Sequence, residues 1–300
     1  MLTLTPLHPL FAAEAAGVDL RQPVAPADFK AIEAALDRYA VLVFRGQDLT
    51  DPQQIAFSSL FGPLGKTRQA DRPGQKLRLH PELSDISNLD ESNRLLAAND
   101  HRRMDGLGNR LWHTDRSFHR VPAKYSLLTG HVVPRTGGET EFADMRAAYD
   151  ALPEATRQSL EDLIAIHSIF TSRAVIGYTD FTPEERAALP PVPQRLVRVH
   201  PGSKRKSLYL ASHASHIEGM PLPEGRLLLL ELMEHATQRP FVYSHAWRQG
   251  DLVIWDNRCT MHRARPFDPA EPRDMRRATV ADSASTLDQI DPLQEQGAGG

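Results

Sequence analysis

The stretch that decides how this chain is interpreted is Leu111-Trp112-His113-Thr114-Asp115-Arg116-Ser117-Phe118. It has the character of an extended segment, and in a strand the side chains at positions i and i+2 point to the same face. His113 and Asp115 can therefore bind one metal ion together, whereas Trp112 and Thr114 point the other way into the packing. These two ligands make half of a metal site.

An imidazole followed two residues later by a carboxylate is a weak signal by itself, because a chain with 13 His produces such pairs by chance. The spacing occurs three times in this sequence. The pair that begins at His80 flanks a proline in a polar stretch, and the pair that begins at His216 runs straight into a glycine, as turns do. Only the pair at His113 lies in a run with strand character. A polar pair facing solvent is the alternative interpretation.

Length and composition are those of an ordinary globular chain. Its 300 residues suit one large domain or two small ones, and a net charge of -3 argues against a nucleic-acid binder that depends on phosphate neutralisation. The apolar N-terminal stretch has no Lys or Arg before it and is interrupted by Glu14 and Asp19, unlike a secretory signal, and no apolar run is long enough to span a membrane. The single cysteine, Cys259, excludes an internal disulfide and a cysteine-based zinc site. We expect a soluble, cytoplasmic protein without nucleic-acid or membrane partners.

The chain is expected to fold as one domain. No repeat or linker divides it, so we expect a single domain over residues 1–282, followed by a polar, mobile tail at 283–300. Residues 64–108 are polar and irregular, which is typical of a lid next to a binding site; disorder is the alternative. Hydrophobic periodicity predicts helices after Pro26, after Thr50, over 145–165 with a break at Pro153, and over 225–238, and strands at 41–44, 85–88, 125–133, 139–142, 196–200, 207–210, 251–255, 259–263 and 275–280.

A third metal ligand is needed, and we choose His262. It lies in an expected strand close to the strongly apolar run 251–255 and precedes a basic cluster. Cys259 is an odd number of residues away and would face away from the metal in a regular strand. Two imidazoles and one carboxylate on one face of an ion leave positions open and suit non-heme Fe(II).

The basic cluster contains two arginines, Arg273 and Arg277, that are four residues apart. This spacing puts both guanidinium groups on one face in a strand or in a helix. Two cations that converge beside a metal repel each other unless anions bind between them. A solvated edge strand that carries arginines is the alternative.

Together these residues resemble the taurine dioxygenase family of Fe(II)- and 2-oxoglutarate-dependent oxygenases, and among its members those that act on aryloxyalkanoic acids. The resemblance covers nearly the whole chain, and its motifs match in order and spacing. The segments that carry it are His113-x-Asp115, Thr140 after a Gly-Gly turn, 7–11, 41–47, 141–150, 213–216, 250–258, His262, Arg273 and Arg277.

The resemblance implies a double-stranded β-helix, a jelly roll with flanking helices, in which His113, Asp115 and His262 hold Fe(II). It implies that 2-oxoglutarate chelates the iron and that its far carboxylate binds Arg273 and the Thr140 hydroxyl. Arg277 would bind the acidic group of the second substrate, and Asn109 would approach that substrate.

The implied reaction uses O2, with ascorbate as the sustaining reductant, and hydroxylates the carbon beside the ether oxygen of the acid. A phenol and glyoxylate are released, with succinate and carbon dioxide from 2-oxoglutarate. A family member that acts on a sulfonate, a sulfate ester or another organic acid is the second interpretation. A metal-dependent hydrolase or a noncatalytic jelly roll is the third. The resemblance also suggests a homo-oligomer.

Several other polar residues are open candidates for the substrate site. Lys66, Arg94 and His101 are candidate anion contacts in the expected lid, although solvated loop charges are the preferred explanation for each. One or two of five further histidines are expected to approach the substrate, and the rest to be structural. These five are His167, His200, His213, His216 and His245.

Overall fold

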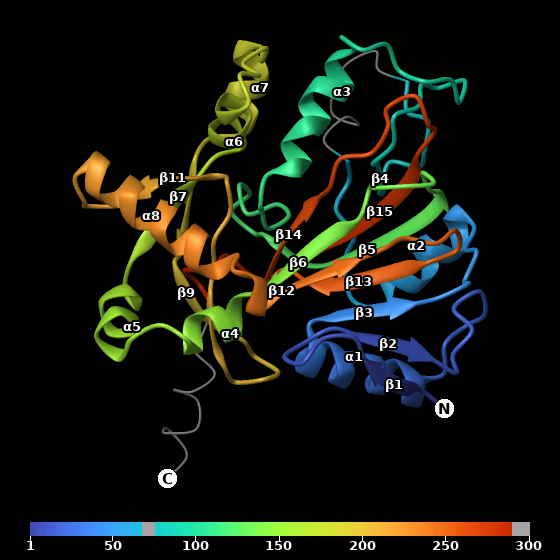
Figure 1. Ribbon diagram of the computed structural model, residues 1–300, viewed down its shortest axis with the longest axis horizontal. Helices are drawn as coiled ribbons and strands as arrows, with labels where there is room; N and C mark the ends of the chain where they lie inside the picture. The colour runs from blue at the N-terminus through green and yellow to red at the C-terminus, as the bar shows by residue number, and fades with distance from the viewer. Residues whose placement is uncertain (68–75, 290–300) are drawn as a thin grey trace.

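The computed structural model describes residues 1–67 and 76–289. Its core is a large sheet of seven strands, in which every neighbouring pair is antiparallel except β2 and β3. In spatial order the strands are β1 (Thr3–Pro6), β2 (Ala13–Ala16), β3 (Val41–Phe44), β13 (Leu252–Asp256), β5 (Ala123–Val132), β15 (Asp274–Ala281) and β4 (Leu83–Asp85). Figure 1 shows this sheet running across the centre and right of the molecule.

Smaller sheets complete the β structure. One three-stranded sheet has β6 as its central strand, and two further sheets are formed by strands between Ile164 and Ile217. The first consists of β12 (Val242–His245), β6 (Thr140–Asp144) and β14 (Thr260–Ala264). The others are β11 (Ala214–Ile217), β7 (Ile164–His167) and β8 (Val192–Arg195), and the hairpin of β9 (Val197–Val199) and β10 (Lys206–Leu208). The hairpin confirms the turn that Pro201-Gly202-Ser203-Lys204 predicts between the strands expected at 196–200 and 207–210.

Side chains alternate between two cores along the central strands, which explains why these strands are apolar throughout. On one face of the large sheet, Val43, Val253 and Trp255 pack with Phe142 of the β6 sheet, so the two sheets share a core. On the other face, Leu42 and Ile254 pack in a cluster with residues of the first two helices. Two facing sheets with helices outside confirm the predicted jelly roll.

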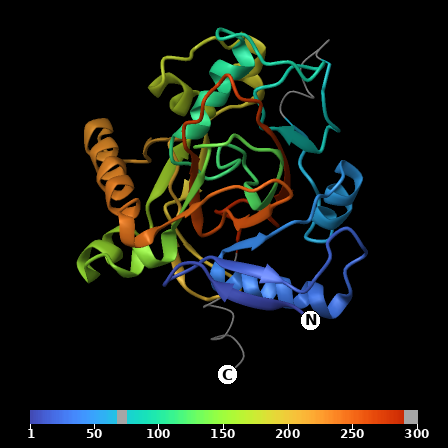
Figure 2. The ribbon, with the colours of Figure 1, turned by 45° about the vertical axis from the view of Figure 1, so that its right-hand side comes forward.

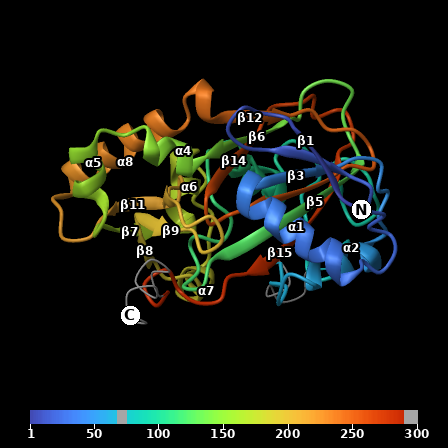
Figure 3. The same cartoon turned by 90° about the horizontal axis from the view of Figure 1, so that it is seen from below.

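Helices cover the outer faces of this core. The helices are α1 (Pro26–Tyr39), α2 (Asp51–Ser59), α3 (His101–Gly106), α4 (Met145–Asp150), α5 (Glu154–Leu160), α6 (Ile169–Val175), α7 (Pro183–Ala188) and α8 (Leu222–Ala236), with short 3-10 turns η2 (Leu107–Arg110) and η3 (Arg239–Phe241). Figure 3 shows α1 and α2 together on one side of the large sheet, and Figures 1 and 2 show α3, α6 and α7 at the opposite end of the molecule from the N-terminus. Among the described residues, no helix has both the length and the apolar character needed to cross a membrane.

Local chemistry explains where the first two helices begin and end. Proline occupies the first turn of both α1 and α2, where its missing N–H is not needed. The Gln53 side chain accepts a hydrogen bond from the backbone N–H of Thr50, 2.9 Å away. Ala40 ends α1 in the left-handed conformation, with φ of 60°, and turns the chain directly into β3.

Three expectations from the sequence are wrong in detail. The residues Asp256-Asn257-Arg258 predict a turn that brings the expected strand 259–263 back beside 251–255, but β14 pairs instead with β6 in the other sheet. Helix does not extend over 145–165, since β7 begins at Ile164. The predicted tail is in contact with the fold at its start: Thr286 is buried, and its hydroxyl donates to Gln194 Oε1 at 2.7 Å. Residues 290–300 of that tail lie outside the described residues.

The crossing from β13 to β14 is fixed by a buried charge network. Asp256 accepts two hydrogen bonds from Arg258, at 2.9 Å to Nε and 2.6 Å to Nη2, and one from His200 Nε2 at 2.8 Å. His200 Nδ1 accepts from the Ser203 N–H, so its Nε2 carries the proton. Burial alone would raise the pKa of Asp256, but Arg258 and then His200 hold it well below its usual range. The network ties the crossing to the β9–β10 hairpin.

We expect Asp256→Ala to lower the free energy of unfolding by about 3–5 kcal/mol, because it leaves the buried Arg258 cation without its carboxylate. Urea unfolding followed by circular dichroism measures the change. Asp19→Ala, which breaks an exposed ion pair with Arg21, is the control and should change little. Equal losses in the two variants would contradict this role. If Asp256→Ala does not fold, the milder Asp256→Asn should still unfold at lower urea than the control.

Candidate functional site

Two histidines that are 149 positions apart in the chain face each other across a single β-bridge. The N–H of His113 donates to the carbonyl of His262 at 3.0 Å, and the reverse bond is 2.8 Å. The ring centroids are 4.2 Å apart. This bridge is isolated, so the extended run predicted around His113 is not a regular strand, and Asp115 lies in the turn that follows.

The residues that alternate with this pair point into the packing, as predicted. Trp112 packs in a core cluster with Ala143 and Met261, and the Arg263 guanidinium lies 4.6 Å from the centre of its ring. The Thr114 hydroxyl donates to the carbonyl of Leu210 at 2.8 Å. One face of the segment is therefore anchored, and the other is left to the site.

His113, Asp115 and His262 form a compact group whose ligand atoms all lie within 4.8 Å of one another. His113 Nε2 is 3.8 Å from Asp115 Oδ1, and His262 Nε2 is 3.6 Å from Oδ2. His113 Nδ1 lies 2.8 Å from the carbonyl of Leu111, which favours the tautomer with a proton on Nδ1 and a lone pair on Nε2. The predicted trio is therefore brought together with its Nε2 atoms and its carboxylate converging.

The environment favours the protonation states that bind metals. Burial lowers the pKa of both imidazoles, and for His262 the neighbouring His113 adds to the effect. Burial alone would raise the pKa of Asp115, but the Arg277 cation and then the two imidazoles lower it to about 2. Neutral imidazoles and an ionised carboxylate are the ligand forms, and two His with one carboxylate suit Fe(II).

Asp115 is held from several sides. The Ser126 hydroxyl donates to Oδ2 at 2.7 Å, and the Asp115 backbone N–H donates to Asn257 Oδ1 at 3.2 Å. Arg277 Nη1 donates to Oδ1 at 2.6 Å. Sequence reasoning missed Ser126, which has no motif of its own, whereas Asn257 lies within the 250–258 segment that carried the resemblance.

A second group with ligand-type atoms, His200, Asp256 and Cys259, is better explained as structural. Its carboxylate already accepts the bonds from Arg258 and His200 described above. Burial raises the pKa of the Cys259 thiol and keeps it protonated. The group therefore offers no free anionic ligand.

Arg273 is a buried cation. Its Nη1 donates to the carbonyl of Ile86 at 3.0 Å, while its Nε is buried without a hydrogen-bond partner in the described part of the chain. Burial lowers its pKa to about 10, so it is still charged at neutral pH. No carboxylate of residues 1–67 or 76–289 forms an ion pair with it. A buried cation with an unused donor has the chemistry to bind an anionic ligand.

A cavity of about 1090 Å³ brings several of these residues together. Its lining includes His113, Asp115, Arg273 and Arg277, so the two arginines reach one cavity as their spacing predicted. Asn109, on η2, also lines it.

Thr140 differs from the other predicted site residues. It lies on β6 opposite Ala264 of β14, and its hydroxyl accepts a hydrogen bond from Trp247 Nε1 at 3.0 Å. Thr140 is not among the residues that line the cavity. Its predicted contact with a cosubstrate therefore stays a prediction.

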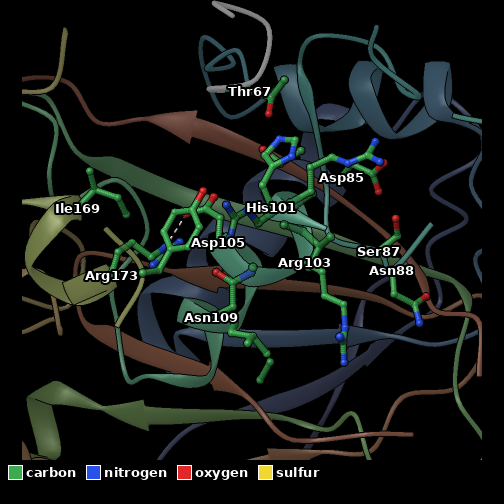
Figure 4. Close-up of a pocket in the computed structure, with 18 of the residues that line it drawn as sticks. Thr67, Asp85, Ser87, Asn88, His101, Arg103, Asp105, Asn109, Ile169 and Arg173 are labelled. Atoms are coloured by element: carbon green, nitrogen blue, oxygen red, sulfur yellow. Dashed lines mark hydrogen bonds and ion pairs between the residues drawn. The ribbon is translucent and has the colours of Figure 1, made fainter. Parts of the chain in front are cut away.

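The cavity has two walls, of which only one was anticipated. Residues from the 64–108 segment form one wall, including Asp85, Ser87 and Asn88, and Ile169 and Arg173 of α6 lie on the other side (Figure 4). The second wall, residues 169–189, carries no sequence signal for a binding role.

A salt bridge connects the two walls. Arg173 Nε donates to Asp105 Oδ1 of α3 at 2.7 Å. Gly108 lets the guanidinium approach, since a Cβ there would lie 2.0 Å from Arg173 Nη1.

The other candidate substrate contacts fall into residues that line the cavity and residues that do not. His213 lines the cavity with its ring centroid 5.9 Å from that of His113, and Lys66 and His101 line it too. Arg94 instead pairs with Asp90 at the surface. The other four histidines do not line it: His167, His200, His216 and His245 bond to Ser117, Asp256, Ser215 and Asp251, respectively.

Comparisons with known proteins agree with this site. A family model described as "Taurine catabolism dioxygenase TauD, TfdA family" matches residues 3–279. The chain is 49% identical to an alpha-ketoglutarate-dependent 2,4-dichlorophenoxyacetate dioxygenase of Cupriavidus pinatubonensis over 93% of this chain and 97% of the relative. It is 40% identical to an (S)-phenoxypropionate/alpha-ketoglutarate-dioxygenase of Sphingobium herbicidovorans over 93% and 94%. The crystal structure of AAD-2 with Mn(II) and N-oxalylglycine superposes with a TM-score of 0.88 at 50% identity, covering 96% of this chain and 100% of that one. The chain belongs to the TauD/TfdA family.

We expect Mn(II), or Fe(II) without oxygen, to bind the intact protein, and His262→Ala to abolish binding. Ser126→Ala should weaken binding roughly 10- to 100-fold, because the hydroxyl that orients Asp115 is lost. Calorimetric titration with Mn(II) measures both effects. Ser207→Ala, which removes another buried hydroxyl on β10, is the control. Unchanged Mn(II) affinity in His262→Ala would show that the metal binds elsewhere.

Proposed function

We propose that this protein is an Fe(II)- and 2-oxoglutarate-dependent dioxygenase that hydroxylates the carbon beside the ether oxygen of an aryloxyalkanoic acid. The observation that carries the proposal is the buried Arg273, a cation without a carboxylate partner among the described residues, in the cavity that His113 and Asp115 line. A hydrolase with the same three ligands has no need of such a cation. The relatives named above support the aryloxyalkanoic acid as substrate.

His113, Asp115 and His262 would hold the iron, leaving positions open for the cosubstrate and O2. When bound, iron and 2-oxoglutarate supply the oxidising power, while ascorbate keeps the metal reduced. Arg273, with Thr140, would bind the far carboxylate of 2-oxoglutarate through charge-assisted hydrogen bonds.

Arg277 would bind the carboxylate of the aryloxy acid. Its Nη1 contacts Asp115, while its Nε is buried without a hydrogen-bond partner in the part of the chain that the structure describes. A substrate carboxylate bound there would lie near the metal ligands, and Asn109 is positioned on the same cavity. The formal charges of iron, Asp115, both arginines, 2-oxoglutarate and the substrate then cancel, which a poorly hydrated site requires.

The overall reaction balances without a further reactant. One oxygen atom of O2 enters succinate as 2-oxoglutarate loses carbon dioxide, and the other becomes the hydroxyl on the substrate carbon. The resulting hemiacetal breaks its bond to the ether oxygen, which takes the proton and leaves as a phenol, and glyoxylate remains. The protein contributes the position of the reacting carbon.

A cytoplasmic location is also part of the proposal. Cys259 is a buried free thiol, and a single unpaired cysteine is typical of reducing compartments.

The first test measures succinate release from 2-oxoglutarate with Fe(II), ascorbate and air. We expect 2,4-dichlorophenoxyacetate to stimulate succinate release at least about tenfold over the reaction without a second substrate, with phenol formed in equal amount. Taurine and an alkyl sulfate ester are the comparison substrates. Stronger stimulation by either would move the protein to another substrate class of the same family. Absence of succinate with every substrate, from protein that binds iron, would contradict the dioxygenase.

The two arginines should affect different substrates. Arg273→Ala should raise KM for 2-oxoglutarate about 10- to 100-fold, the equivalent of one charge-assisted hydrogen bond, with Mn(II) binding retained. Arg277→Ala should raise KM for the aryloxy acid by a similar factor and leave that for 2-oxoglutarate within about twofold. Arg276→Ala is the control, because Arg276 lies between them and pairs with Asp51 and Asp274. Identical kinetic changes in the two test variants would contradict this division.

A further inference from the structure

All the side-chain hydrogen bonds of Asn88 go to the backbone of residues 269–273, the segment that ends at Arg273. Its Oδ1 accepts from the Arg273 backbone N–H at 2.8 Å, and its Nδ2 donates to the carbonyls of Glu271 and Pro269 at 2.8 and 3.2 Å. The Asn88 backbone N–H donates to the Arg273 carbonyl at 3.3 Å. The residue is only 8% exposed. One amide therefore fixes three residues of the loop between β14 and β15.

The neighbouring Ile86 fixes the other end of the same arginine. Its carbonyl accepts from Arg273 Nη1 at 3.0 Å, and its N–H donates to the carbonyl of Met275 at 2.9 Å. The guanidinium also lies 5.5 Å from the centre of the Phe267 ring. Backbone and guanidinium of Arg273 are thus both held by residues 86–88, which belong to the segment expected to be a substrate lid.

The loop between β14 and β15, which Asn88 contacts, has a reduced number of backbone donors. Residues 265–273 contain Pro266, Pro269 and Pro272, which lack a backbone N–H and cannot donate. The Asn88 amide donates to the carbonyl of one of these prolines, Pro269, and to that of Glu271. Without the Asn88 side chain, the Arg273 N–H and the carbonyls of Pro269 and Glu271 lose these partners. The guanidinium is then held less firmly, by its bond to the Ile86 carbonyl and by the backbone bond from Asn88 to the Arg273 carbonyl.

We infer that Asn88 is a positioning residue for Arg273, and that residues 86–88 consequently set the affinity for 2-oxoglutarate as well as forming a wall of the substrate cavity. Figure 4 shows Asn88 beside Ser87 on that wall. The inference rests on the proposed function, because it requires Arg273 to bind the cosubstrate.

The test compares Asn88→Ala with a variant that loses an equally buried amide elsewhere. Gln54 is fully buried, and its Nε2 donates to the carbonyls of Leu127 and Arg276 while its Oε1 accepts from Thr129. Gln54→Ala should therefore lower thermal stability as Asn88→Ala does, without touching Arg273. We expect Asn88→Ala to raise KM for 2-oxoglutarate about tenfold with kcat within about twofold, and Gln54→Ala to leave KM unchanged.

A binding measurement removes the dependence on turnover. Calorimetric titration of 2-oxoglutarate into the Mn(II)-loaded protein, without a second substrate, should give about tenfold weaker binding for Asn88→Ala. In the background of Arg273→Ala, adding Asn88→Ala should have no further effect, since the residue acts through that arginine. Asn88→Asp keeps an acceptor for the Arg273 N–H but loses both donors, and should give an intermediate KM.

The outcomes separate the inference from the proposed function. Wild-type protein that binds Mn(II) but neither binds nor consumes 2-oxoglutarate would overturn the proposed function. Wild-type turnover with an unchanged KM in Asn88→Ala would overturn the inference alone. Equal increases of KM in Asn88→Ala and Gln54→Ala would also overturn it, because they would show a general loosening of the fold.

Discussion

The pair of backbone hydrogen bonds between His113 and His262 is the contact on which the candidate site depends. It joins a turn-rich segment near residue 113 to β14, an outer strand of the three-stranded β12-β6-β14 sheet. Because paired residues in an antiparallel bridge present their side chains on the same side, the bridge brings two imidazoles together. Asp115 then needs only to reach back from the following turn. The rest of the fold holds this bridge in place: Trp112 and Thr114 anchor one partner, and pairing with β6 anchors the other.

Charge sets the second constraint. Asp115 is the carboxylate that faces Arg277, and Arg273 has no carboxylate partner among the described residues, so cations exceed anions around the triad. Such an excess is unfavourable in a buried site unless anionic ligands complete it. Elsewhere in the core the protein balances its buried charges internally, as Asp256 does with Arg258. The difference between the two networks is what marks the first as a binding site.

The sequence predicted the parts of this site that follow from local rules, and missed those that depend on tertiary contacts. Apolar runs located the central strands, and spacing brought Arg273 and Arg277 to one cavity. The resemblance supplied the jelly roll, whereas His262 was chosen among many histidines because it lies in an expected strand and precedes the basic cluster. Strand character around His113 was overestimated, because the segment gains its single bridge from a partner 149 residues later. Ser126 and Arg173 carry no motif, and Thr286 gave no sign that the chain stays packed beyond residue 282.

The two walls of the cavity are bound to the site in different ways, and this difference matters for substrate choice. The α6 wall is linked to α3 by the salt bridge between Arg173 and Asp105, and the Arg173 charge also contributes to lowering the pKa of His113. Residues 86–88 instead hydrogen-bond directly to the chain around Arg273. If Arg273 binds the cosubstrate as proposed, a substitution at residues 86–88 therefore affects both a wall of the cavity and the chain that carries Arg273.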